Sequence, residues 1–261
     1  MSDKQGDISL DLLGIKPIAD ATNAVVNKSL NGIECFLKIV CEPALEEFGL
    51  LLNDKVRFWR LKNIMSILEK AQGKLCFKND RLEIKANPRI ALAIMENGSL
   101  IDNDEVQEMW AGIFTSSCTK DGQDDENLIF VDLLKQMTVC EARILKYSCE
   151  TARKIIFENG LIVGDGLSIE CNKLIKLSGV NEIQRLDREL NHMHSINLIE
   201  GFFGGGFDNL DNSLEANITP TSLALNLYAK TQGYNGDLKI FWQSNLITYQ
   251  EKEKEKQEQK K

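Results

Sequence analysis

The side chains best suited to acid–base, nucleophilic or metal chemistry are two histidines, His192 and His194, and seven cysteines, which include Cys140, Cys149 and Cys171. Two histidines at i and i+2 point to different sides of a helix, and the sequence has no CxxC pair, so the spacing disfavours zinc. The fold could bring a histidine next to Cys140 or Cys149 to form a nucleophilic pair, but no spacing in the sequence indicates such a pair. We therefore expect no metal, no cofactor and no catalytic residue, and we expect Cys149 to be a core residue.

A glycine-rich stretch, Gly201–Asn209 (GFFGGGFDN), is the second candidate site. It matches neither GxxxxGK[ST] nor GxGxxG and has no lysine close behind, which disfavours a phosphate loop. Glycines that accept positive φ favour the tight turn of a wing-like hairpin. Such a turn leaves at least one of Phe202, Phe203 and Phe207 exposed. We expect these phenylalanines to form a protein-docking or homo-oligomer contact.

The most basic part of the sequence surrounds Phe58 and Trp59. Its cations could grip a phosphate, an anionic lipid head group or RNA, and they are Lys55, Arg57, Arg60 and Lys62. The alternative is the hydrated face of an amphipathic helix that buries Trp59. We favour this alternative.

DNA binding needs cations that reach phosphates. A candidate recognition helix in the C-terminal half supplies Arg185 and Arg188, but three acids in the same segment offset them, and residues 189–229 contain no Lys or Arg. The formal net charge of the chain, −8, also lacks the basic footprint of a nonspecific nucleic-acid binder. We therefore favour protein docking over DNA contact for this region.

Composition places the chain among globular proteins. It has 261 residues, of which 43% are hydrophobic and 27% charged, enough for one large core or two modest ones. Scattered, odd-numbered cysteines indicate reduced thiols and a cytoplasmic location. The acidic N-terminus does not resemble a signal peptide. The apolar segment Ile33–Leu52 carries five charges, which favours an amphipathic helix over a membrane span.

Apolar periodicity predicts a mainly α-helical protein whose residues 1–136 form an α-helical domain. Apolar side chains recur at spacings of three and four along 43–72, and another helix is expected over 128–136. Pro88 is placed to open a helix that ends at Asn97-Gly98. Asp102 is the expected N-cap of the next helix, with Glu105 three residues later as in a capping box.

Residues 137–247 are expected to form a winged-helix-like domain with a small β-hairpin. Thr138 and Glu141 form a second capping box, and one or two short strands, a short helix ending at Gly179, a longer helix and the glycine stretch follow. The longer helix should bury an apolar stripe, namely Ile183, Leu186, Leu190, Met193 and Ile196. Residues 248–261 form a charged, low-complexity tail that we expect to be solvated or frayed.

Three stretches carry a resemblance to a known family: Pro43–Asn63 (PALEEFGLLLNDKVRFWRLKN), Ile101–Ser117 (IDNDEVQEMWAGIFTSS) and Phe130–Leu145 (FVDLLKQMTVCEARIL). The chain resembles the abortive-infection alpha family, a prokaryotic domain of unknown function, and the tryptophan stretch is the most specific of the three. The resemblance implies a role in anti-phage defence in the cytoplasm. It implies no catalytic residues.

Three functions are consistent with these features. The first is a non-enzymatic phage-defence protein that acts through protein contacts or self-association. The second is a winged-helix DNA-binding regulator that uses Arg185 and Arg188. The third is a membrane-active effector in which Ile33–Leu52 and the phenylalanine tip lie in a lipid interface.

Overall fold

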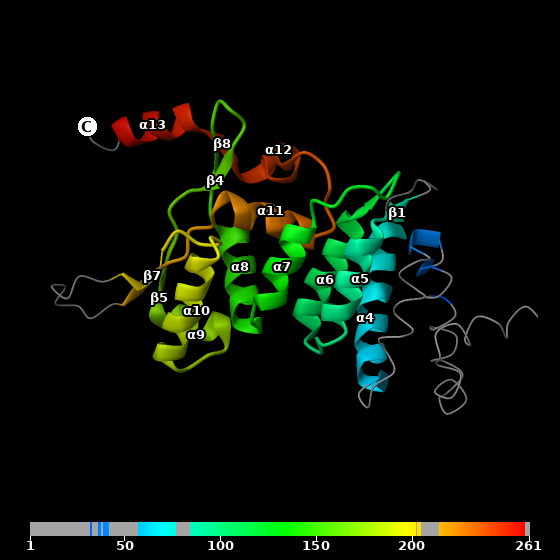
Figure 1. Cartoon of the computed structure of the whole chain (residues 1–261). Helices are drawn as coiled ribbons and strands as arrows, with labels where there is room; N and C mark the ends of the chain where they lie inside the picture. The colour runs from blue at the N-terminus through cyan, green and yellow to red at the C-terminus, as the bar shows by residue number, and fades with distance from the viewer. Residues whose placement is uncertain are drawn as a thin grey trace, which may run out of the picture. The chain divides into compact units, whose positions relative to one another are not determined.

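The computed structural model describes residues 32, 36–37, 39–41, 57–76, 84–201, 203–204 and 214–258 (Figure 1). The chain divides into two compact units, Met1–Lys135 with Lys230–Asn235 and Gln136–Ala229 with Gly236–Lys261. The described residues are mainly helical, with a few short strands, so the expected fold class is confirmed at this level.

Unit 1 is a helical assembly. It contains helices α4 (Arg57–Cys76), α5 (Pro88–Gly98) and α6 (Asp104–Ser116), most of α7 (Leu128–Gln136), and the two-stranded antiparallel pair β1 (Lys85–Ala86) and β2 (Cys118–Thr119). Its core lies where the apolar faces of these helices meet, and its fully buried side chains include Ile64, Ile67, Ile94, Trp110 and Phe114.

The helix ends of unit 1 follow local sequence signals, with one correction. Pro88 opens α5 and Gly98 ends it, as expected. Asp102, however, is not the N-cap of α6. Asn103 holds that position, and its side-chain oxygen accepts the Val106 N–H at 3.1 Å. The one-residue shift places Glu105 too early in the helix for a capping box.

Unit 1 also includes the end of α11 (Ser222–Thr231), which approaches α6 closely. A Cβ atom built on Gly112 would lie 1.6 Å from the carbonyl oxygen of Thr231. Only a glycine leaves room for this backbone contact.

Unit 2 combines helices with two three-stranded sheets (Figure 1). One sheet has the order β4-β3-β8, in which β3 (Lys154–Ile156) pairs antiparallel with β4 (Ile162–Gly164) and parallel with β8 (Leu246–Thr248). The other has the order β5-β7-β6, all antiparallel, with strands β5 (Ser168–Glu170), β6 (Phe203–Gly204) and β7 (Glu215–Asn217). The helices are α8 (Val139–Thr151), α9 (Cys171–Ser178), α10 (Ile183–Ser195), α11, α12 (Leu238–Phe241) and α13 (Tyr249–Glu258), with a 3-10 turn, η1, at Gln243–Asn245.

Two local predictions for unit 2 are confirmed. Thr138 and Glu141 form the expected capping box at the start of α8. Gly179 ends α9 in the left-handed conformation, with φ of 74°. At both places the side chain or its absence settles the backbone without help from distant residues.

Two other predictions need correction. Leu186, Leu190 and Met193 are buried on α10, but Ile183 is 46% exposed, and Ile196 is half-buried just after the helix ends. Ile183 is the first residue of the helix, and its side chain tilts beyond the helix start, away from the packed turns. The tail expected to be frayed instead forms α13 as far as Glu258.

Candidate functional site

The acid–base side chains of unit 2 meet between the start of α8 and the middle of α10. The Thr138 hydroxyl donates to Glu189 Oε2 at 2.5 Å and accepts the Glu141 N–H at 3.2 Å. Glu141 Oε2 accepts the Thr138 N–H at 2.8 Å, and its Oε1 lies 2.6 Å from His192 Nδ1. Arg185 Nε donates to the other Glu189 oxygen at 3.2 Å. We call these five residues the α8–α10 brace.

Burial dominates the electrostatics of the brace. The Glu141 side chain is fully buried, and burial raises its pKa against the opposing effects of the Thr138 N–H and His192. Both of its oxygens have partners, so a buried carboxyl group is satisfied on both sides. The geometry fits a fixed junction between two helices.

The cysteines do not join this brace as nucleophiles. Burial, with help from the nearby carboxylates Glu189 and Glu141, raises the pKa of the Cys140 thiol to about 12. Burial also raises the pKa of Cys149 to about 12, and that thiol points to the backbone oxygen of Ala224. A thiol with such a pKa stays protonated at neutral pH and is a poor nucleophile.

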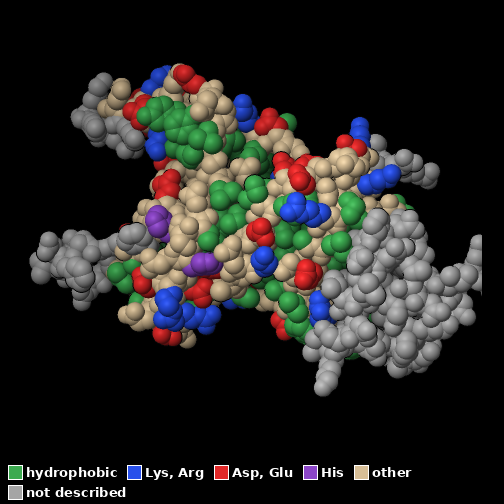
Figure 2. All heavy atoms as spheres, in the orientation of Figure 1, with side chains coloured by type: hydrophobic (Ala, Val, Ile, Leu, Met, Phe, Trp, Pro, Cys, Tyr) green, Lys and Arg blue, Asp and Glu red, His purple; other side chains and the backbone are tan. Residues whose placement is uncertain are grey.

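The other candidate metal ligands do not converge. His194 Nδ1 lies 3.2 Å from the Ile199 carbonyl oxygen, while His192 contacts Glu141. Both histidines reach the surface in Figure 2. Within the described ranges, no group of three His, Cys, Asp or Glu side chains could hold a metal ion.

A buried lysine is the feature that sequence reasoning missed. Lys154 on β3 is fully buried, and its Nζ lies 4.3 Å from the centroid of the Trp242 ring. Neither Lys154 Nζ nor Trp242 Nε1 has a hydrogen-bond partner among the described residues. Trp242 stacks on Tyr228 at 5.7 Å, and the Tyr228 hydroxyl donates to Glu150 at 2.6 Å. Burial lowers the pKa of Lys154.

The two arginines considered for DNA contact differ in their surroundings. Arg185 is engaged with Glu189 in the brace. Arg188 is exposed on α10. The sequence places acidic residues near both arginines, and in the structure one of these acids, Glu189, contacts Arg185.

The basic cluster around Phe58 is only partly described. Lys55 lies outside the described residues, as does the side chain of Arg57. Arg60 Nε donates to Ser99 Oγ at 3.0 Å, and Lys62 is exposed. The expected burial of Trp59 is wrong: Trp59 is 39% exposed and Phe58 is 54% exposed. Both lie in the first turn of α4, where the packed core of the helix, at Leu61, Ile64 and Ile67–Leu68, has not yet begun.

The phenylalanines of the glycine stretch are also described only in part. Phe202 and Phe207 lie outside the described residues. Phe203 is half-buried on β6, opposite Ala216 of β7. Gly201 is buried, and a Cβ atom there would lie 2.7 Å from the Asn217 side chain. The prediction of an exposed aromatic tip stays a prediction.

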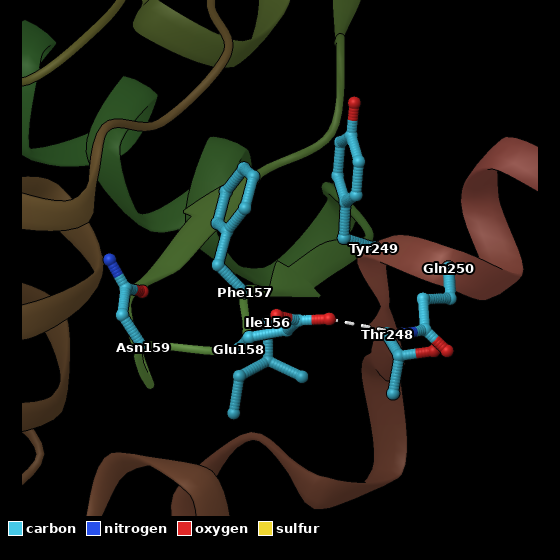
Figure 3. Close-up of a pocket in the computed structure, with 7 residues that line it drawn as sticks. All are labelled: Ile156, Phe157, Glu158, Asn159, Thr248, Tyr249 and Gln250. Carbon is cyan, nitrogen blue, oxygen red and sulfur yellow. Dashed lines mark hydrogen bonds between the residues drawn. The ribbon is translucent and has the colours of Figure 1, made fainter.

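A hollow of about 720 Å³ opens between the β3–β4 turn and the start of α13 (Figure 3). Phe157 and Tyr249 lie on the same side of it, with ring centroids 5.1 Å apart, and Gln250 donates to Glu158 at 3.1 Å. The remaining lining residues are Ile156, Asn159 and Thr248. Figure 2 shows apolar side chains exposed beside α13, with charged side chains around them.

Among the described residues, no helix combines the length and the apolar character that a membrane span needs.

Comparison with known proteins gives one match. A family model described as abortive infection alpha matches residues 60–232. Neither the search of curated proteins nor the search of solved structures produced a match. Since the family model covers about two thirds of the chain, the chain belongs to the abortive infection alpha family.

Proposed function

We propose that this member of the abortive infection alpha family acts in anti-phage defence without catalysing a reaction, through contacts with a protein partner or with a second copy of itself. The observation that carries the proposal is the family match over residues 60–232. The state of the reactive side chains supports it. The His192 and Glu141 pair is engaged in joining α8 to α10, and burial keeps the Cys140 and Cys149 thiols protonated.

We interpret part of unit 2 as winged-helix-like. After α8, β3 and β4 the order is β5, α9, α10, β6, β7, and β7 lies between β5 and β6 in the sheet, which supports this interpretation. In it α10 is the third helix, and β6 and β7 are the strands of the wing. The candidate contact is then the wing, with Phe202, Phe203 and Phe207 as its aromatic residues.

The proposal is tested by infection with and without the gene. We expect fewer plaques on the strain that carries it, and equal plating on both strains would overturn the defence role. A second measurement tests the contact. Sedimentation and partner pull-down of a Phe202→Ser, Phe203→Ser, Phe207→Ser variant that stays folded should show loss of association. Burying one aromatic anchor contributes roughly 1.5–3 kcal/mol, or one to two orders of magnitude in a dimer equilibrium. Unchanged mass and unchanged pull-down would remove the wing from the proposal.

The winged-helix-like order also favours a second candidate, a DNA-binding regulator. The exposed Arg188 is its best cation, whereas Arg185 is paired with Glu189. A gel-shift titration separates the two functions. Sequence-specific retention that weakens in Arg188→Ala would favour the regulator, and no shift even at low salt would exclude it.

Exposed Phe58 and Trp59, next to Lys62, favour a third candidate, binding to anionic membranes. Flotation with anionic liposomes tests it directly. Recovery of the protein with the vesicles, and its loss in a Phe58→Ser, Trp59→Ser variant, would support membrane binding. Absence of the wild-type protein from the floated fraction would exclude it.

A further inference from the structure

The C-terminal helix α13 is folded although it buries none of its described side chains. Its sequence, YQEKEKEKQE, has no apolar face beyond Tyr249. An isolated ten-residue helix of this kind is unstable in water, because nucleation is costly and packing normally supplies the stability. Contacts with the rest of unit 2 must therefore hold α13 in place.

Several of these contacts are ionic. Lys252 Nζ lies 2.6 Å from Asp165 Oδ1, and Arg153 Nη1 lies 2.8 Å from Glu255 Oε2. Arg153 also contacts Asp165 at 2.9 Å, so the four charges alternate in sign in one network. The side chains are between 19% and 44% exposed. Salt screens ion pairs at such positions.

The contacts before and after η1 differ in kind. Trp242, just before η1, is buried, packs over Lys154 and stacks on Tyr228. After η1 the chain forms the three-residue strand β8, whose side chains are half-buried or exposed, and then α13. A buried attachment thus precedes a more exposed one, which consists of the β8–β3 pairing, the Tyr249–Phe157 stack and the ionic network, and η1 (Gln243–Asn245) is the boundary.

We propose that β8 and α13, residues 246–258, form a flap that hinges at η1 and is held closed by the network of Arg153, Asp165, Lys252 and Glu255. Opening of the flap removes β8 from β3 and separates Tyr249 from Phe157. Strand β3 then presents an unpaired backbone edge beside the Phe157 ring. The β3 edge is therefore exposed only while the flap is open. This control of its exposure goes beyond the proposed contact function.

Hydrogen exchange of the full chain tests the flap, because it reports local opening segment by segment. The test variant is Lys252→Gln with Glu255→Gln, which removes both flap-side charges of the network and leaves the net charge unchanged. The matched control is Lys254→Gln with Glu258→Gln, which removes one exposed charge of each sign from the same helix. All proteins are measured at low salt and at about 1 M salt, where the Debye length is about 3 Å.

We expect the amides of residues 246–258 in the wild type to exchange roughly five-fold faster at high salt, the effect of two partly exposed ion pairs. The test variant should show this faster exchange already at low salt and respond little to salt, while the control behaves as the wild type. Helices α8 and α10 should be unaffected in all proteins. Equal exchange in the test variant and the control, or no salt effect in the wild type, would overturn the proposal. Faster exchange of α8 or of the Trp242 segment together with the flap would also overturn it, since unit 2 would then open as a whole.

Discussion

Replacing Thr138 is the sharpest test of the α8–α10 brace, because one hydroxyl makes two contacts there. It accepts the Glu141 N–H as the N-cap of α8, and it donates to Glu189, which is 8% exposed. Loss of an N-cap costs about 1 kcal/mol. Loss of a hydrogen bond to a buried charged group costs about 1.5–3 kcal/mol. Glu189 keeps its contact with Arg185, so the second loss lies at the lower end of its range, and we expect Thr138→Ala to lower the free energy of unfolding by about 2.5 kcal/mol in total.

The assay is urea unfolding followed by circular dichroism, with the slope and midpoint fitted for each protein. Thr138→Ser keeps the hydroxyl and should cost less than about 0.5 kcal/mol. Thr248 offers a matched control, since its hydroxyl contacts only Glu251, three residues further along the chain, among the contacts described. Thr248→Ala removes a cap at an exposed position and no contact with a residue distant in sequence, and it should cost about 1 kcal/mol or less. If Thr138→Ala and Thr138→Ser unfold at the same urea concentration, the brace does not stabilise unit 2 and the reasoning is refuted.

Three further predictions follow from buried positions. Gly112→Ala should lower the free energy of unfolding by about 3 kcal/mol or more, because the new methyl group would collide with the backbone of Thr231 in α11. The control is Gly73→Ala on α4, where a Cβ atom has no neighbour within 4 Å; it should leave the stability unchanged or raise it in the same urea titration. Cys140 and Cys149, each with a pKa of about 12, should react with iodoacetamide at pH 8 roughly a thousandfold more slowly in the folded protein than in urea, as measured by mass spectrometry; equal rates would contradict their burial. The pKa of Lys154 is lowered in the folded state, so protonation of this lysine favours unfolding at pH values below its unfolded-state pKa, and the penalty disappears as the pH rises. Lys154→Met should therefore be more stable than the wild type by about 1 kcal/mol at pH 7, with a smaller difference at pH 10. A variant that is less stable at both pH values would show that the contact of Lys154 with the Trp242 ring outweighs the cost of its burial.

Sequence reasoning succeeded where the signal is local. The capping box of Thr138 and Glu141, the left-handed Gly179 and the bounds of α7 depend on residues within a few positions of one another. It placed the N-cap of α6 one residue early, because Asp102 and Asn103 are both good caps and tertiary packing decides between them.

It failed where partners are distant in sequence. His192 meets Glu141 across 51 residues, and Arg153 meets Glu255 across 102. The sequence ARKII does not distinguish Arg153, whose side chain is 40% exposed and reaches Asp165 and Glu255, from Lys154, which is buried against Trp242. Helix α13 was missed for the same reason, since an alternating Glu-Lys tail acquires a fixed position only through a network whose other members lie just before β3 and just after β4.

The tryptophan stretch that carried the family resemblance most specifically turns out to be interior. Trp110 is fully buried, and its Nε1 has no hydrogen-bond partner within the described part of the chain. Gly112, two residues on, is the point at which α6 touches the backbone of Thr231. Both residues therefore serve the packing of unit 1. A substitution at either residue is expected to change the stability of the protein, and that change would obscure any direct effect on defence. Variants meant to separate defence from folding belong on exposed residues instead. Arg188 on α10 and Phe58 on α4 are such positions, and each is tied to a different candidate function. A loss of defence in only one of them, with unfolding unchanged in both, would identify the surface on which the protein acts.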